Sequence, residues 1–166
     1  MDTKRVTKNF LWSELLVSSS FPELAAKIIL DEKDKYNYYH LISTTLQPQR
    51  EFSSIQTKIV QGKRSLELYQ AIKNVGFNPS ASSQHFCRNP FDCAIDFQKI
   101  RLYDDGKINI NMSRIATYEA FLWIKKHCRF GFGQMYHTAP IIESEQIGFV
   151  HIGSVTPARQ GETWTK

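Results

Sequence analysis

An aspartate stands inside a short apolar run that is typical of a β-strand, Cys93-Ala94-Ile95-Asp96-Phe97. A carboxylate between alanine, isoleucine and phenylalanine is costly to bury unless it is paired, hydrogen-bonded or bound to a metal. His85 precedes it in a polar stretch, and His151 interrupts a second strand-like run, G-F-V-H-I-G. Two histidines and one aspartate can bind zinc and leave one coordination position open to water. We therefore expect the fold to bring His85, Asp96 and His151 together.

The hydrophobic pattern of the rest of the chain predicts helices that alternate with short strands. A helix is expected at 22–30, with Ser20 as its cap and Pro22 in its first turn, and another in a stretch that ends before Pro48. The remaining expected elements are helices at 66–75, capped by Ser65, and 117–126, and strands at 55–60, 94–100, 107–110, 130–137 and 148–152. The sequence therefore predicts an α+β fold, with N-terminal helices packed on a small central antiparallel sheet.

Length and composition are those of an ordinary globular protein. The 166 residues are 42% hydrophobic and 22% charged, so the chain can bury a core. We expect a single domain over residues 1–166, with a polar arm at 1–8 and a tail at 153–166. The first residues lack the apolar segment of a signal peptide, and no stretch is long enough to span a membrane. These features predict a protein that is made in a cytoplasm.

Net charge and cysteine content place only weak limits on the binding partners and on the chemistry of the protein. A net charge of +5 suits polyanions, including nucleic acid and cell-wall polymers, but the basic residues are scattered, which disfavours a nucleic-acid-binding protein. Cys87, Cys93 and Cys128 form no C-x-x-C pair. Partly buried, reduced thiols are the favoured interpretation, and a zinc role or a local disulfide for Cys87 and Cys93 is the alternative.

Several segments in order resemble the zinc D-Ala-D-Ala carboxypeptidase and endopeptidase family of cell-wall enzymes, part of the LAS group named for lysostaphin, the D-Ala-D-Ala peptidases and sonic hedgehog. The matching segments are N-F-L-W-S-E-L from residue 9, L-Q-P-Q-R from residue 46, G-K-R-S from residue 62, S-Q-H from residue 83, A-I-D-F from residue 94 and F-V-H-I from residue 149. Each string alone is weak, but their order is colinear over most of the chain.

The resemblance implies a LAS/hedgehog-like fold with a Zn²⁺ ion held by His85, Asp96 and His151. It also implies that the ion activates a water that attacks the scissile peptide carbonyl. Arg64 resembles the family arginine that steadies the substrate carbonyl or the developing oxyanion. Ser83 and Gln84 are then expected to hydrogen-bond the substrate backbone.

Some positions depart from the family pattern. The interval from His85 to Asp96 is longer than usual, which predicts a bulged loop between them. Many relatives carry the catalytic base as E-x-x-H, and the glutamate position here is Gly148. Another branch ends with F-V-H-V-D-T-G, and its aspartate is replaced here by Gly153. Glu143 and Glu145 are the preferred substitutes for the base, and His137 and Asp92 are the other candidates.

The function implied by the resemblance is a zinc metallopeptidase that cleaves stem or cross-link peptides of bacterial peptidoglycan. A bacteriophage product fits the absence of a signal peptide. It would be a hydrolase that stays in the host cytoplasm until its release as an endolysin for cell wall degradation, or one carried in the virion beside other virion proteins. The alternative is a catalytically impaired phage structural or cell-wall-binding protein that retains the peptidase fold. A nucleic-acid-binding module is the weakest reading of charge and aromatic content.

Overall fold

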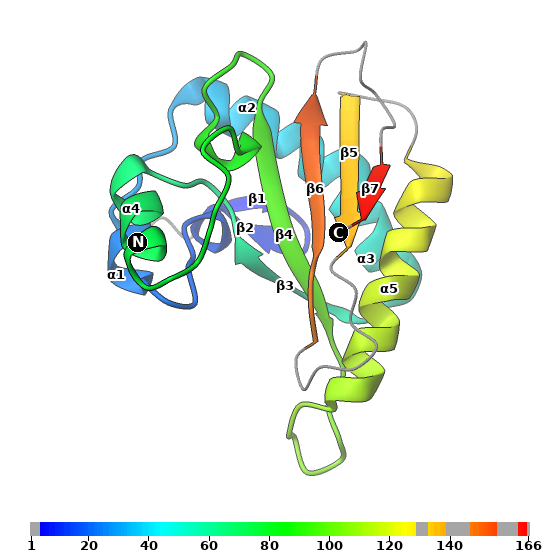
Figure 1. Ribbon diagram of the computed structural model, residues 1–166. Coiled ribbons are helices and arrows are strands. Elements are labelled where there is room, and N and C mark those ends of the chain that lie inside the picture. Colours follow the sequence, from blue (N-terminus) through cyan, green and yellow to red (C-terminus); the bar gives the residue numbers. More distant parts are fainter. Residues whose placement is uncertain (1–3, 129–132, 139–146, 156–162, 166) are drawn as a thin grey trace.

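The structure, a computed structural model, describes residues 4–128, 133–138, 147–155 and 163–165. Its main sheet is five-stranded, in the order β3-β4-β6-β5-β7 (Figure 1). The strands are β3 (Gln56–Gln61), β4 (Cys93–Ile100), β6 (Val150–Val155), β5 (Gly133–Thr138) and β7 (Thr163–Thr165). Neighbours are antiparallel except β5 and β7, which are parallel. The predicted α+β class is confirmed, since helices accompany this small, largely antiparallel sheet.

The helices lie around the sheet rather than in a separate layer of their own. They are α1 (Pro22–Ala26), α2 (Glu32–Leu41), α3 (Gln47–Ser53), α4 (Leu66–Asn74) and α5 (Ile110–His127), with 3-10 turns η1 (Trp12–Leu15) and η3 (Gln84–Phe86) and a π-helical turn η2 (Ile42–Leu46). In Figure 1, α2 and α3 lie behind the sheet, and α1 and α4 lie to one side of it, near β3.

One face of the sheet forms the core. Ile95 and Phe97 of β4 belong to the same buried cluster as Val150 and Ile152 of β6, together with side chains of α2 and α5 such as Tyr38, Leu41, Ala120, Phe121 and Ile124. Because side chains alternate along a strand, the residues between these, including Asp96 and His151, belong to the other face. The core therefore positions β4 and β6 so that Asp96 and His151 point away from it.

The long helix α5 begins at Ile110, whereas the sequence predicted a strand at 107–110 and a helix only from Thr117. Asn109 is the N-cap, and its Oδ1 accepts a hydrogen bond from Met112 N at 3.0 Å. In place of the expected strand, a single antiparallel bridge joins Leu102 and Ile108 around a turn. The alternating pattern of this segment was misleading because capping and packing against β4 favour the helix.

The first two predicted helices also have different bounds. Phe21, not Ser20, is the N-cap of α1, and the helix ends at Ala26 rather than near residue 30. The second helical stretch continues past Pro48 through η2 and α3, and Gln47 N donates to Ile42 O across the wide π turn. A wide turn accommodates proline, which cannot donate a backbone hydrogen bond. By contrast, the predicted cap of α4 is confirmed, since Ser65 Oγ accepts from Leu68 N at 3.1 Å.

Both ends of the chain carry more structure than the expected arm and tail. Residues 5–7 form β1 (Arg5–Thr7), which pairs antiparallel with β2 (Phe10–Leu11), and Val6 is buried. β6 continues to Val155, and β7 adds a parallel strand beside β5. The sheet therefore includes part of the segment that was expected to be a tail.

Candidate metal centre

Two adjacent strands place Asp96 and His151 directly opposite each other. The antiparallel register of β4 and β6 pairs Asp96 with His151, so their side chains share the face of the sheet away from the core. His151 Nδ1 lies 2.6 Å from Asp96 Oδ1. The buried residues on either side of each, such as Ile95 and Ile152, fix the strands in this register.

His85 reaches the same point from the turn η3. Ser83 caps this turn, and its Oγ accepts a hydrogen bond from His85 N at 3.3 Å. Arg64 N donates to His85 O at 2.8 Å, and the His85 ring places Nδ1 2.6 Å from Gly62 O. A carbonyl oxygen only accepts, so Nδ1 carries the proton, and Nε2 of the neutral ring offers a lone pair.

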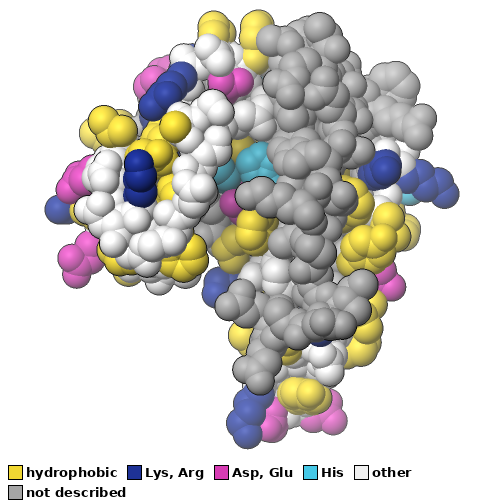
Figure 2. Space-filling model, viewed as in Figure 1, with side chains coloured by type: hydrophobic (Ala, Val, Ile, Leu, Met, Phe, Trp, Pro, Cys, Tyr) yellow, Lys and Arg dark blue, Asp and Glu magenta, His cyan; other side chains and the backbone are white. Residues whose placement is uncertain are grey.

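The lone pair of His85 Nε2 faces the carboxylate without a hydrogen bond. Asp96 Oδ2 lies 3.2 Å from Nε2, yet among the described residues this buried nitrogen has no hydrogen-bond partner of acceptable geometry. A buried polar atom in this state calls for an explanation, and a metal ion is one. Figure 2 shows histidine and acidic side chains next to each other near the middle of this face of the molecule.

The spacing of the donor atoms is suited to one cation. Around a zinc ion with bonds of about 2.0–2.2 Å, neighbouring ligand atoms in a tetrahedral site lie roughly 3.3 Å apart. The ligand atoms of His85, Asp96 and His151 all lie within 4.8 Å of one another, and the two imidazole rings are nearly perpendicular, with an interplanar angle of 76°. This group could therefore hold a metal ion.

Electrostatics favours the protonation states that metals bind. Burial alone raises the pKa of Asp96, but attraction by His85 and His151 and the hydrogen bond with His151 outweigh it, so the pKa lies well below its ordinary value. Burial lowers the pKa of His85 by more than the pull of Asp96 raises it. The centre thus presents a carboxylate and a neutral imidazole, which are the forms that act as ligands.

Arg64 lies beside this group and is itself buried. Its Nη2 donates to Gln61 Oε1 at 3.3 Å, whereas its Nε has no hydrogen-bond partner among the described residues. Burial lowers the pKa of Arg64, and the nearby Asp96 carboxylate opposes that shift. A guanidinium stays charged in proteins, so Arg64 offers an available donor at the edge of the centre.

The predicted substrate-binding residues are held by the protein itself in the structure. Ser83 caps η3, and Gln84 Nε2 donates to Ser154 O at 2.6 Å. Gln84 Oε1 lies 3.4 Å from His151 Nε2. Both residues therefore border the centre, but their polar atoms make contacts within the chain.

The loop between the first two residues of the group bulges outward, as its length predicted. Helix α2 ties the loop down, since Lys33 Nζ donates to Cys87 O at 2.7 Å and Asn37 Nδ2 donates to Pro90 O at 2.9 Å. Asp92 is partly buried in this loop, and its Oδ2 accepts a hydrogen bond from Asn89 Nδ2 at 2.7 Å. The extra residues thus leave the positions of His85 and Asp96 supported by α2 and β4.

The candidates for a catalytic base are placed only in part. Glu143 and Glu145 lie outside the described residues. The backbone register of β5 and β6 pairs His137 with His151, one strand further from Asp96. Gly148, three residues before His151, has a φ of 74°, a conformation that other residues adopt only with strain.

Two glycines contribute to the centre in ways that the sequence did not indicate. Gly62, the first residue of the G-K-R-S segment, supplies the carbonyl that faces His85 Nδ1. At Gly153, an ideal Cβ would lie 2.1 Å from Gln84 Oε1. A glycine directly after a predicted strand was the available signal at position 153, but its meaning depends on a contact between distant segments.

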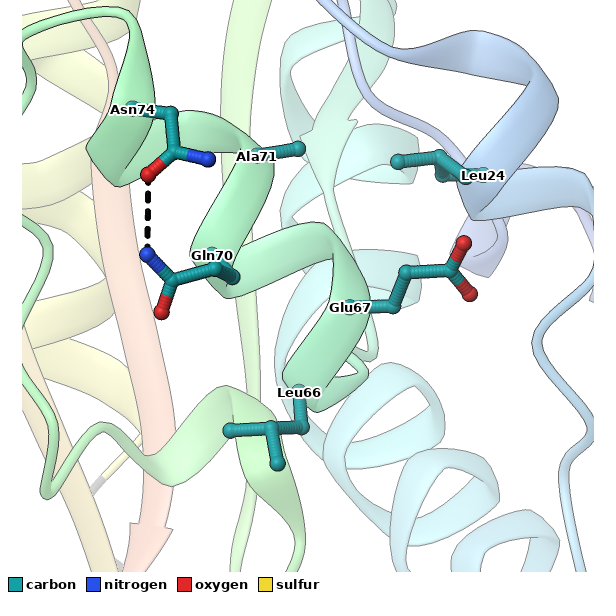
Figure 3. A pocket seen from close by; sticks show the side chains of 6 residues that line it. All are labelled: Leu24, Leu66, Glu67, Gln70, Ala71 and Asn74. Atoms are coloured by element: carbon teal, nitrogen blue, oxygen red, sulfur yellow. Dashed lines mark hydrogen bonds between the residues drawn. The ribbon is translucent and has the colours of Figure 1, made fainter.

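The cysteines take no part in the group. Cys87, Cys93 and Cys128 are buried, and burial raises the pKa of Cys87 to about 12 and that of Cys128 to about 11. A separate pocket lies between α1 and α4 (Figure 3). Its lining residues are Leu24, Leu66, Glu67, Gln70, Ala71 and Asn74, none of which belongs to the histidine–aspartate group.

Comparison with models of protein families, with curated proteins and with solved structures gave no match. Among the described helices, none combines the length and the apolar character that a bilayer crossing requires. The chemistry of the centre must therefore be inferred from its own residues.

Proposed function

We propose that the protein is a zinc metallopeptidase that hydrolyses peptide bonds of bacterial peptidoglycan, with His85, Asp96 and His151 as the zinc ligands. The observation that carries the proposal is the convergence of these side chains from η3, β4 and β6 on one face of the sheet. Two imidazoles and one carboxylate form a donor set that zinc prefers in catalytic sites. The colinear motifs supply the enzyme class and the LAS-type fold.

Arg64 is the residue that we assign to the substrate carbonyl. A zinc ion held by the three ligands would supply Lewis-acid chemistry, polarising a peptide carbonyl and lowering the pKa of water. The Arg64 side chain is buried, its Nη2 donates to Gln61 Oε1 at 3.3 Å, and its Nε has no hydrogen-bond partner among the described residues. A fixed charged donor of this kind stabilises negative charge as it develops on the carbonyl oxygen.

The general base is proposed to come from Glu143, Glu145 or His137. Of these, His137 has a described backbone position, directly opposite His151 on the neighbouring strand. A base must act close to the metal ligands, and the backbone register pairs His137 with His151, one of the proposed ligands. If His137 is the base, His137→Ala abolishes hydrolysis and leaves zinc binding in place.

A second candidate function is a catalytically impaired structural or cell-wall-binding protein with the same fold. The positive φ of Gly148 favours it, because that backbone conformation suits glycine and disfavours the glutamate that many relatives carry there. In either case we propose a bacteriophage product, either an endolysin or a virion component.

The test is zinc content combined with peptide release. The purified protein is expected to bind about one zinc ion per chain by elemental analysis and to release new amino termini from purified peptidoglycan. His85→Ala should abolish both, whereas His127→Ala should retain both, because His127 is exposed at the end of α5 and lies outside the group. Circular dichroism checks that each variant is folded.

The outcomes separate the two functions. Zinc binding with peptide release that His85→Ala removes supports the peptidase. Stoichiometric zinc without release of wall peptides contradicts the peptidase and leaves the impaired protein. Failure to bind zinc, even when zinc is supplied in excess, contradicts the metal centre itself.

A further inference from the structure

The Gln84 side chain joins the turn η3 to strand β6. Gln84 lies next to His85 in the chain, but its carboxamide reaches residues far away in sequence: Nε2 donates to Ser154 O at 2.6 Å, and Oε1 lies 3.4 Å from His151 Nε2. A single side chain therefore contacts β6 at two points beside the metal centre.

The Ser154 carbonyl fixes which end of the amide faces the histidine. A carbonyl oxygen can only accept a hydrogen bond, so the end of Gln84 that meets Ser154 O must be the NH₂ group. Oε1 therefore faces His151 Nε2, where it accepts a long hydrogen bond if that nitrogen carries a proton. If His151 Nδ1 gives up its proton in binding a metal, the remaining proton lies on Nε2 and Gln84 Oε1 is in place to accept it.

Gly153 provides the space for this arrangement. It lies within β6, paired with Ala94 and Met135, and its φ is not positive. Glycine weakens a strand interior, so its presence needs a cause other than backbone conformation. The cause is steric, because an ideal Cβ at this position would lie 2.1 Å from Gln84 Oε1 and 2.8 Å from its Cδ.

Both histidines then show the same arrangement. In each ring one nitrogen faces the Asp96 carboxylate and the other faces a protein oxygen: Gly62 O for His85 Nδ1, and Gln84 Oε1 for His151 Nε2. Histidines that ligate metals usually donate their second N–H to such an oxygen, which fixes the tautomer and the ring orientation. The pairing leaves His85 Nε2 and His151 Nδ1 as the ligand atoms.

We infer that Gln84 is a positioning residue that holds His151 with Nδ1 toward the metal, and that Gly153 is glycine so that Gln84 can do so. This inference rests on the proposed metal centre. It assigns Gln84 to the support of a ligand, in place of the expected contact with the substrate backbone. It also explains why residue 153 carries no side chain, since the Gln84 carboxamide occupies the space that a Cβ would take.

The test is a cycle of Gln84→Ala, Gly153→Ala and the double variant, measured by zinc affinity in competition with a chromophoric chelator. Loss of a partner of this kind typically lowers metal affinity on the order of 10–100-fold. We expect that loss for Gln84→Ala. Gly153→Ala should produce a similar loss, because its methyl group displaces the flexible end of Gln84 and leaves the strand backbone in place. In the Gln84→Ala background, Gly153→Ala should cause little further change.

A spectroscopic measurement separates positioning from a general structural effect. In the zinc-loaded protein, ¹⁵N NMR of the histidine rings should show His151 protonated at Nε2, with slow exchange of that proton. In zinc-loaded Gln84→Ala the exchange should become fast, while the His85 Nδ1 proton, held by Gly62 O, should remain protected. Thermal unfolding of each variant confirms that it is folded.

The results distinguish failure of this inference from failure of the metal centre. If the wild type binds zinc and Gln84→Ala binds it equally well, or if the losses in the cycle simply add, Gln84 does not position His151 and only this inference is overturned. If Gln84→Ala does not fold, Gly153→Ala tests the same contact with Gln84 intact. If the wild type binds no zinc, the metal centre and the positioning role are both overturned.

Discussion

Lys99 is fully buried on the core side of β4, where its Nζ donates to Gln49 Oε1 and to Thr57 Oγ1, each at 2.7 Å. Within the described part of the chain, no carboxylate lies within ion-pair distance of this amine. Burial, together with repulsion by the nearby Arg50, lowers the pKa of Lys99 to about 7. A neutral amine has two N–H donors, which match the two oxygens that face it.

The stability of the protein should therefore depend on Lys99 in a defined pH window. Between about pH 7 and 10, the unfolded chain keeps this lysine protonated while the folded chain does not, so the free energy of unfolding rises with pH. One such group contributes a slope of up to about 1.4 kcal/mol per pH unit. Lys99→Met should flatten the slope by that amount in urea titrations across the window.

The matched control for this prediction is Lys58→Met. Lys58 is exposed on β3, so its removal should leave the slope unchanged. The slope decides the test rather than the absolute stability, because methionine also leaves Gln49 Oε1 and Thr57 Oγ1 without their donor. Equal slopes in the wild type and Lys99→Met would show that Lys99 is charged in the folded protein.

For single residues, the sequence is most informative where a side chain conflicts chemically with its neighbours in the chain. Asp96 in an apolar strand demanded a partner, and the structure brings His85 and His151 to it. The role of Gln84 was not predictable, because glutamine and serine in S-Q-H are as suitable for a substrate as for the protein. Its contact with Ser154 depends on a strand that is distant in the sequence.

Among the elements, the junction of β3, η1 and η3 supports the centre. The segment after β3 passes close to η1, where Lys63 N donates to Leu15 O at 3.0 Å, and Gly62 O faces His85 Nδ1 of η3. An ideal Cβ at Gly62 would lie 2.1 Å from Leu15 O and 2.7 Å from Leu15 Cα. These are backbone atoms, so a side chain at this position could be accommodated only by moving one element away from another.

Gly62→Ala should thus destabilise the fold as well as the centre. We expect a loss of about 1–3 kcal/mol or more in the free energy of unfolding, as for other overpacked positions, measured by urea denaturation. Gly153→Ala is the matched comparison, because the obstacle there is a flexible side chain and the stability loss should be smaller. If the two variants lost equal stability, the close approach to Leu15 would not control this junction.

The bounds of the helices show where the local sequence pattern no longer predicts secondary structure. Ser65 was identified as a cap because a serine precedes an amphipathic segment, and its hydrogen bond to Leu68 N is present. Asn109 has the same role for α5, but it lies in an alternating segment that resembles a strand. The packing of α5 against β4 decides between the two structures, and that contact involves residues outside the segment.

For the whole molecule, contacts between distant segments also explain why strands form near both ends of the chain. β1 and β7 each have three residues, too few to form a recognisable alternating pattern. β1 exists because it pairs with β2, and β7 because it pairs with β5. An expected arm and tail therefore become strands only once their partners are in place, which sequence periodicity does not reveal.

The proposed metal centre links segments from across the molecule, since His85 lies in η3, Asp96 in β4 and His151 in β6. A ligand that binds only the folded chain stabilises it by about 2.7 kcal/mol when its free concentration is 100 times Kd. For a chain of this length, that corresponds to a rise of about 5–10 °C in Tm. Removing zinc with a chelator should lower Tm by this amount, and adding zinc back should restore it.

His85→Ala provides the control for the thermal shift, because it removes one ligand and leaves Asp96 and His151 facing each other across β4 and β6. Its Tm should be insensitive to zinc, and differential scanning calorimetry with and without chelator measures the difference. Because Asp96 and His151 stay paired without a metal, zinc-free wild type should still unfold cooperatively. A zinc-dependent rise in Tm of equal size in His85→Ala would place the stabilising ion elsewhere in the protein and contradict this centre.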